Sequence, residues 1–153
     1  MKVTDFLAAD MVVADLVADT KAGVLAELSR HLATRMAGVD PEVLRRVLEE
    51  RELLASTAIG DGIAIPHGKM DAVGRLVGAL GRARAGIEFE SIDGKPTHLV
   101  FMLVAPASST GVHLKALARL SRLFRDADFR ARLLEAPDAV AMYQAIVDED
   151  SKY

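Results

Sequence analysis

The chain contains no cysteine. This absence excludes disulfide bonds, thiol catalysis and cysteine-based metal sites, and it is compatible with a reducing compartment. An excess of charge of one sign is also missing, because 19 basic and 22 acidic residues give a formal net charge of −3 with both signs interspersed. The sequence therefore gives no indication of a nucleic-acid-binding surface.

Long hydrophobic runs are missing as well. The apolar run from Leu99 to Pro106 is far too short to cross a bilayer. The N-terminus, in which Asp5 and Asp10 follow closely on Lys2, does not have the pattern of a signal peptide. The chain also lacks a low-complexity linker and internal repeats. With 153 residues and 51% hydrophobic content, we expect one domain over residues 1–153, located in the cytoplasm and not inserted in a membrane.

Helical periodicity is present in the first third of the chain. Thr20 is a candidate N-cap for a helix that Gly38 ends, and Asp40 followed by Pro41 has the residue pair typical of a second helix start. The residues expected on the buried sides of these two helices are Val24, Leu25, Leu28, Leu32, Met36, Val43, Leu44, Val47, Leu48 and Leu54.

The middle of the chain changes to short apolar runs that predict strands. These runs cover residues 76–80 and 98–104, the second predicted to be buried on both faces, with a turn at residues 91–96 between them. Helical spacing returns from Val112, over residues 127–134, and from Pro137 onward. The apolar residues expected on these later helices are Leu114, Leu117, Leu120, Leu123 or Phe124, Val140, Tyr143, Ile146 and Val147. This order predicts an α/β fold, a mixed sheet with helices on both faces.

One histidine lies in an unusual backbone setting. His67 ends a short apolar stretch enclosed by glycines and followed by Gly68 and Lys69. Glycine tolerates conformations closed to other residues, and the preceding Pro66 restricts φ, so the segment predicts a rigid strand-to-loop junction that presents an imidazole to solvent or to a partner. The segment is not a nucleotide-binding loop, because five residues separate Gly62 from Gly68 and no Ser or Thr follows the lysine.

The other histidines differ in their contexts. His31 lies between polar residues of a helix and is expected to be solvated, and His98 at a strand entry is expected to be structural. No two histidines have the spacing of a metal site, so a metal has little support. His113 falls in a first helical turn, where free N–H groups favour an anion, although an exposed histidine is the plain alternative.

Arg51, Ser56 and Thr57 complete the set of candidate residues. Arg51 alone is typical of a solvated arginine, and Ser56 and Thr57 either donate to an anion or cap a turn. Together with His67 and His113, they suit the binding of a phosphoryl group on an imidazole nitrogen, because phosphoryl transfer requires positioning and stabilisation of the equatorial oxygens. A two-histidine hydrolase would also need a carboxylate or metal to activate water, and no distinctive one is evident.

Several pieces of the chain follow one another in an order known from one family. They are Arg51-Glu52 through Ser56-Thr57, Ile59 to Lys69, Phe89 to Pro96, Ala105-Pro106 and His113-Leu114-Lys115-Ala116-Leu117. Over about Lys21 to Val147, the chain resembles the enzyme IIA domains of the fructose/mannitol type of the phosphoenolpyruvate-dependent sugar phosphotransferase system. The residues around His67, Gly-Ile-Ala-Ile-Pro-His-Gly-Lys, are most similar to those of the nitrogen-regulatory members. Those members stand alone, and fused transporter domains are absent here too.

The resemblance implies a phosphorylation site at His67, with His113 as second active-site histidine and Arg51 as supporting cation. It also implies a three-layer α/β/α fold with a mixed sheet of about five strands, and it requires neither metal nor nucleotide. The donor would be an HPr-type phosphocarrier protein. A regulatory member binds target proteins according to its phosphorylation state, a sugar-specific member passes the group to an enzyme IIB, and a non-catalytic binding module on the same fold is a further alternative. Ile63, Ile65, Met70 and Val112 are expected to contact such partners.

Overall fold

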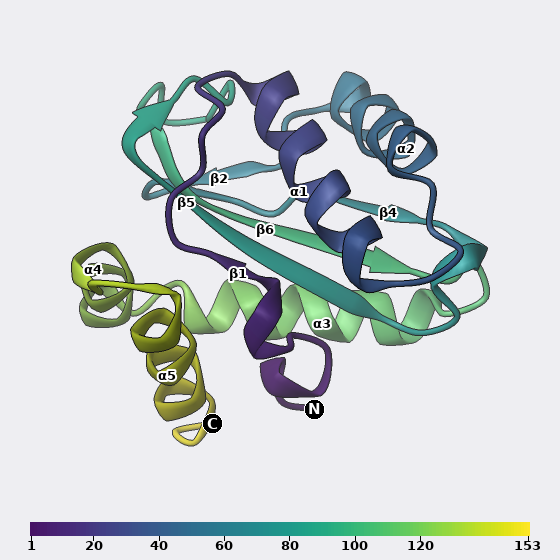
Figure 1. Cartoon of the computed structure of the whole chain (residues 1–153). Coiled ribbons are helices and arrows are strands. Elements are labelled where there is room, and N and C mark those ends of the chain that lie inside the picture. The colour runs from purple at the N-terminus through teal and green to yellow at the C-terminus, as the bar shows by residue number, and fades with distance from the viewer.

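The computed structural model describes residues 1–153 and has a mixed sheet between two layers of helices (Figure 1). The strands are β1 (Val12–Val13), β2 (Ala58–Gly60), β3 (Ile63–Ala64), β4 (His67–Lys69), β5 (Val77–Ile87) and β6 (Thr97–Ala105). The helices are α1 (Lys21–Arg35), α2 (Pro41–Leu54), α3 (Thr110–Leu123), α4 (Ala127–Glu135) and α5 (Ala139–Asp150). Helices α1 and α2 cover one face, and α3 to α5 lie on the other (Figure 1). The predicted three-layer α/β/α fold is confirmed, with six strands rather than about five.

The strand order is β1-β5-β6-β3-β2, and β4 pairs with β6 off this path. Strands β5 and β6 are antiparallel, whereas β3 and β4 both run parallel to β6. Ile63 of β3 is opposite Leu99, and His67 of β4 is opposite Leu103, so the two short strands follow one another along the same edge of β6. Strand β4 therefore has a neighbouring strand on one side only, and its other edge is free to border a site.

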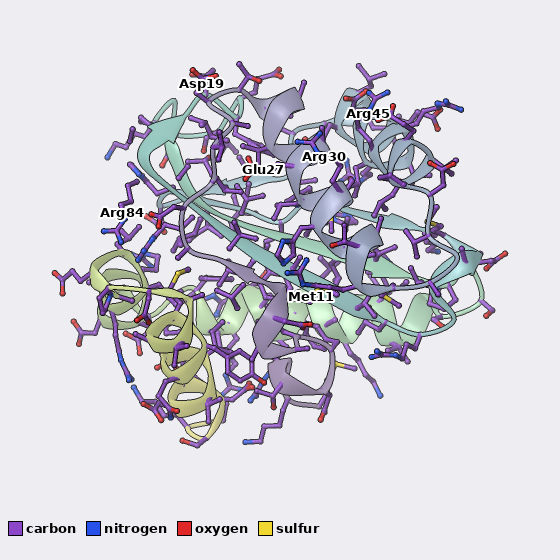
Figure 2. The ribbon with its side chains drawn as sticks, in the orientation of Figure 1. Met11, Asp19, Glu27, Arg30, Arg45 and Arg84 are labelled. Atoms are coloured by element: carbon purple, nitrogen blue, oxygen red, sulfur yellow. The ribbon has the colours of Figure 1, made fainter.

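Strand β6 is buried along nearly its whole length, as its continuous apolar run predicts. Strand β5 continues well past its predicted end at Leu80, with the fully buried Arg82 at its centre. The Arg82 guanidinium donates to the carbonyls of Leu133 and Ala136, each at 2.7 Å. Arg84, labelled on β5 in Figure 2, donates to the Ala136 carbonyl at 3.3 Å. These two arginines bind the end of α4 to the sheet, so polar residues here extend the strand.

The helix starts agree closely with the predicted caps. The Thr20 hydroxyl accepts from the Gly23 N–H at 3.0 Å, and the Asp40 carboxylate accepts from the Glu42 N–H at 2.9 Å. Helix α1 ends earlier than predicted, at Arg35 with Met36 as its C-cap, and Gly38 lies in the turn that follows, with a φ of 84° in the left-handed region that favours glycine.

Four predicted core positions are wrong, since Val43, Leu54, Leu114 and Val140 are all exposed. Each lies beside the stripe that its helix actually buries. In α2 that stripe is Leu44, Leu48 and Glu52, in α3 it is His113, Ala116, Leu120 and Leu123, and in α5 it includes Met142, Ala145, Ile146 and Glu149. Residues on the flank of a buried stripe can remain exposed to solvent. Two of the four, Leu54 and Leu114, border the cavity described below.

The N-terminal residues contribute to the core without showing helical or strand periodicity. Two 3-10 turns, η1 (Val3–Asp5) and η2 (Ala9–Met11), precede β1, and a third, η3 (Asp71–Val73), follows β4. The buried Asp150 carboxylate of α5 accepts from the backbone N–H groups of Val3 and Thr4 at 3.0 and 3.1 Å. This contact joins the two ends of the chain. None of the helices combines the length and the apolar character that crossing a membrane requires.

Candidate functional site

A cavity of about 610 Å³ opens at the free edge of β4, between α2 and α3. Its lining residues are Val47, Glu50, Arg51, Leu54, His67, Gly68, Lys69, Thr110, His113, Leu114 and Leu117. Gly68 allows the close approach of α2, because a Cβ atom there would lie 2.7 Å from Cγ1 of Val47. The structure thus brings the two histidines and Arg51, which are far apart in sequence, around one cavity.

His67 is half-buried and held by its own backbone segment. Its Nδ1 lies 2.8 Å from the carbonyl oxygen of Ile65. Since a carbonyl oxygen can only accept, Nδ1 carries the hydrogen, and Nε2 keeps the free lone pair of the neutral ring. The strand-to-loop geometry around His67 therefore selects which nitrogen can act as nucleophile.

The pKa of His67 is lowered, mainly because burial penalises the charged ring. The hydrogen bond to Ile65 raises this pKa, the positive charge of Arg51 lowers it, and the negative charge of Glu52 raises it. The net result is an imidazole that is neutral at neutral pH. A neutral imidazole has the lone pair that a nucleophile needs.

His113, in the first turn of α3, packs edge-to-face against His67. The ring centroids are 5.3 Å apart with an interplanar angle of 88°. His113 is buried, and its Nε2 has no hydrogen-bond partner. Burial, followed by the charges of His67 and Lys69, lowers the pKa of His113 to about 4. The second ring is therefore neutral too, and it retains an unused polar nitrogen beside the first.

Two cationic side chains border the same cavity. Arg51 donates through Nη1 to the carbonyl oxygen of Ala55 at 2.9 Å, which holds it at the C-terminal end of α2. Lys69 donates through Nζ to the Thr110 hydroxyl at 2.9 Å, linking β4 to the start of α3. An anion in the cavity would meet two positive charges and a hydroxyl group, with the carboxylate of Glu50 as the one negative group of the lining.

Sequence reasoning assigned no role to Lys69 or Thr110, although the helical spacing of Thr110 and His113 contained a signal for the second. Lys69 lies two residues after His67, so the two share one side of a strand. Thr110 lies three residues before His113, and residues at this spacing lie on one side of a helix.

Ser56 and Thr57 are not among the residues that line the cavity. The Ser56 hydroxyl donates to the carbonyl of Phe89 at 2.6 Å, and the Thr57 hydroxyl is paired with the buried Glu52 carboxylate. Both hydroxyls therefore hold the loop between α2 and β2, which corresponds to the turn-capping alternative.

The remaining histidines have backbone partners elsewhere. Nδ1 of His98 lies 3.1 Å from the carbonyl of Ala83, in agreement with a structural role. Nε2 of His31 lies 2.7 Å from the carbonyl of Asp10, so this half-buried ring is more than a solvated side chain. The chain has no group of three or more His, Cys, Asp or Glu side chains arranged to hold a metal ion.

The predicted partner contacts also need a correction. Ile63 and Ile65 are only 1% and 3% exposed, because both belong to the core beneath the site and cannot contact a partner. Val112 is exposed and Met70 is half-buried. The exposed apolar residues at the cavity itself are Leu54 and Leu114.

Comparison with known proteins gives consistent matches. The chain is 40% identical to a nitrogen regulatory protein of Bradyrhizobium diazoefficiens over 146 residues, 95% of each chain. It is 36% identical to the fructose-specific EIIABC component of Bacillus subtilis, matching 98% of this chain but 24% of that longer protein. The crystal structure of nitrogen regulatory protein IIA-Ntr from Neisseria meningitidis superposes with a TM-score of 0.87 at 30% identity, covering 94% of this chain and 98% of that one.

The model of one protein family matches almost the whole chain. It is described as "Phosphoenolpyruvate-dependent sugar phosphotransferase system, EIIA 2" and matches residues 5–149. This range includes every residue that lines the cavity. On this match and on the similarity to the Bradyrhizobium protein, the chain belongs to the type 2 enzyme IIA family of the phosphoenolpyruvate-dependent sugar phosphotransferase system.

Proposed function

We propose that the protein is a phosphoryl carrier that accepts a phosphoryl group on Nε2 of His67 from an HPr-type phosphohistidine protein. The observation that carries this proposal is the hydrogen bond from Nδ1 to the Ile65 carbonyl, which leaves Nε2 as the free nitrogen of a neutral ring at a cavity with two cations. The Nε2 lone pair attacks phosphorus while the donor's P–N bond breaks. The donor imidazole keeps the electron pair of the broken bond.

The other cavity residues have roles that follow from their chemistry. Arg51 and Lys69 stabilise the charge of the equatorial oxygens, and the Thr110 hydroxyl donates to one of them. His113 stays uncharged and supplies a ring N–H to the phosphoryl group, which gives its unpartnered Nε2 a partner. No further group is needed for the transfer, because the phosphorus is already activated in the donor.

The rim of the cavity suits a transient protein partner. Leu54 is 81% exposed and Leu114 is 62% exposed, and they lie on the two helices that flank His67. Apolar side chains of this kind are buried when a partner covers the site, while the charges beside them favour a partner that brings a phosphoryl group. We propose this rim as the docking surface of the donor.

A regulatory role is supported by the 40% identity with a nitrogen regulatory protein over 95% of both chains. Phosphorylation adds about 1.5 to 2 negative charges at pH 7. Such a change cancels most or all of the positive charge of Arg51 and Lys69 at the cavity, so a target protein can distinguish the two states without any refolding. The similarity to a fructose-specific component supports the alternative, in which the group passes to an enzyme IIB.

The test is phosphorylation of the purified protein with phosphoenolpyruvate, enzyme I and the HPr-type carrier. We expect an acid-labile phosphate on the wild type, none on His67→Ala, and slow onward transfer from His113→Ala. His98→Ala is the matched control, because His98 is a half-buried histidine outside the cavity that also bonds a backbone carbonyl. Absence of label on the wild type with a cognate, active donor would contradict the carrier function. Addition of an enzyme IIB then separates sugar transport from regulation.

A further inference from the structure

A buried carboxylate lies on α2 directly after Arg51. The buried stripe of this helix runs through Leu44 and Leu48 at intervals of four residues, and the next position is Glu52. Glu52 is 8% exposed, and its position four residues after Leu48 is one where an apolar side chain is expected. Since burying an ionised carboxylate is unfavourable unless it is paired and hydrogen-bonded, its contacts need an explanation.

Both carboxylate oxygens of Glu52 are occupied. Oε2 accepts from the Thr57 backbone N–H at 3.0 Å and lies 3.0 Å from Nζ of Lys21 on α1. Oε1 is hydrogen-bonded to the Thr57 hydroxyl. Lys21 also lies 3.3 Å from the exposed Glu90 and 4.9 Å from the ring centroid of Phe89. The carboxylate therefore fixes one residue, Thr57, through two hydrogen bonds.

Thr57 is connected to the imidazole of His67 by two further hydrogen bonds. The Thr57 carbonyl accepts from the Ile65 N–H at 3.0 Å, and the Ile65 carbonyl is the partner of His67 Nδ1 at 2.8 Å. The carbonyl that selects the tautomer of His67 thus belongs to a segment whose position depends on Thr57. A continuous path runs from Lys21 through Glu52, Thr57 and Ile65 to the ring.

We propose that Glu52 is a positioning residue for His67, which acts through Thr57 and Ile65 to keep Nδ1 protonated and Nε2 free, with Lys21 as its counter-ion. The part played in phosphoryl transfer rests on the proposed function, whereas the effect on the ring itself does not. The hydrogen bonds of Thr57 thereby orient the His67 ring from the side of the protein core. Arg51, the residue before Glu52, borders the cavity.

The charge of Glu52 supports this assignment. Burial lowers the pKa of His67 most. Of the charged groups that act on the ring, Arg51 lowers this pKa and Glu52 raises it. His113 is the neutral ring packed against it. The carboxylate therefore offsets part of the effect of the neighbouring guanidinium, in addition to its hydrogen bonds.

The experiment compares the full-length wild type with Glu52→Gln, which keeps the shape of the side chain and removes its charge. Glu90→Gln is the matched control, because Glu90 also pairs with Lys21 but makes no hydrogen bond to Thr57. Nitrogen-detected NMR of the imidazole gives the tautomer ratio and the pKa of His67, and phosphoryl uptake from the HPr-type carrier gives the rate. In Glu52→Gln we expect more Nε2–H tautomer, a lower pKa and an uptake rate reduced on the order of tenfold or more.

Glu90→Gln should leave all three readouts as in the wild type. A folded Glu52→Gln protein with unchanged tautomer ratio and pKa would overturn the proposal. If Glu52→Gln does not fold, Thr57→Val decides, because it removes only the hydroxyl bond to the carboxylate and should shift the tautomer ratio in the same direction. A shifted tautomer ratio in a protein that takes up no phosphate would support the positioning role and contradict the proposed function.

Discussion

Acidification should destabilise the protein through His113, because this ring is buried in its neutral form. Burial and the charges of His67 and Lys69 lower its pKa from 6.5 to about 4 in the folded state. Between these two values the unfolded chain binds a proton that the folded protein does not bind. Stability therefore rises with pH through this interval and is lost as the pH falls from 6.5 toward 4.

The two pKa values give the size of the effect. Lowering the pH from about 7.5 to about 5 should reduce the free energy of unfolding by about 2 kcal/mol through this one group, and by about 3 kcal/mol in total once the pH is below about 4. His113 is only 6% exposed, so solvent screening reduces this value little.

The assay is urea denaturation of the wild type and of His113→Gln at the two pH values. Other groups titrate in both proteins, so the relevant quantity is the difference between the two losses. We expect the wild type to lose about 2 kcal/mol more than the variant on acidification. Equal losses in the two proteins would refute the conclusion that His113 is neutral because of its burial.

Two further predictions concern the rim of the site and the junction of the chain ends. Leu54→Glu should slow phosphoryl uptake from the carrier several-fold in stopped-flow assays and leave the melting temperature unchanged, because Leu54 is 81% exposed; wild-type uptake would exclude it from the docking surface. Asp150→Ala should cost about 3 kcal/mol or more in urea denaturation, because it removes the buried partner of Arg119 and of the Val3 and Thr4 N–H groups. A loss below about 1 kcal/mol would contradict that reading.

The helices could be predicted from the sequence because their signals are local. Thr20, Asp40 and Asp138 are N-caps whose side chains accept from the first turns of α1, α2 and α5. The short strands β1, β2 and β4 could not be predicted, since two or three residues hold too little periodicity, and β3 was indicated only by the strand-to-loop junction before His67. Strand β5 was predicted only in part, because the hydrogen bonds that make Arg82 a buried strand residue come from the end of α4, about fifty residues later.

The candidate site shows the same division between local and distant information. His67, His113 and Arg51 each have an ordinary structural alternative. Their shared suitability for a phosphoryl group and the resemblance to a family joined them, and the structure places them around one cavity. Thr110 could have been found from helix spacing, whereas the side that Lys69 shares with His67 depends on β4, a strand too short to be predicted. Ser56 and Thr57 could not be assigned, because their partners, Phe89 and Glu52, depend on how the loop folds back.

The identity of the phosphorylated atom tests most directly whether His67 carries the phosphoryl group on Nε2. Phosphorus–nitrogen NMR on the protein phosphorylated by the HPr-type carrier distinguishes the two ring nitrogens of a phosphohistidine. Because His67 Nδ1 is 2.8 Å from the Ile65 carbonyl, we expect a single phosphohistidine at His67 with phosphorus bonded to Nε2. Phosphorus on Nδ1, on another residue, or on no residue at all would contradict it.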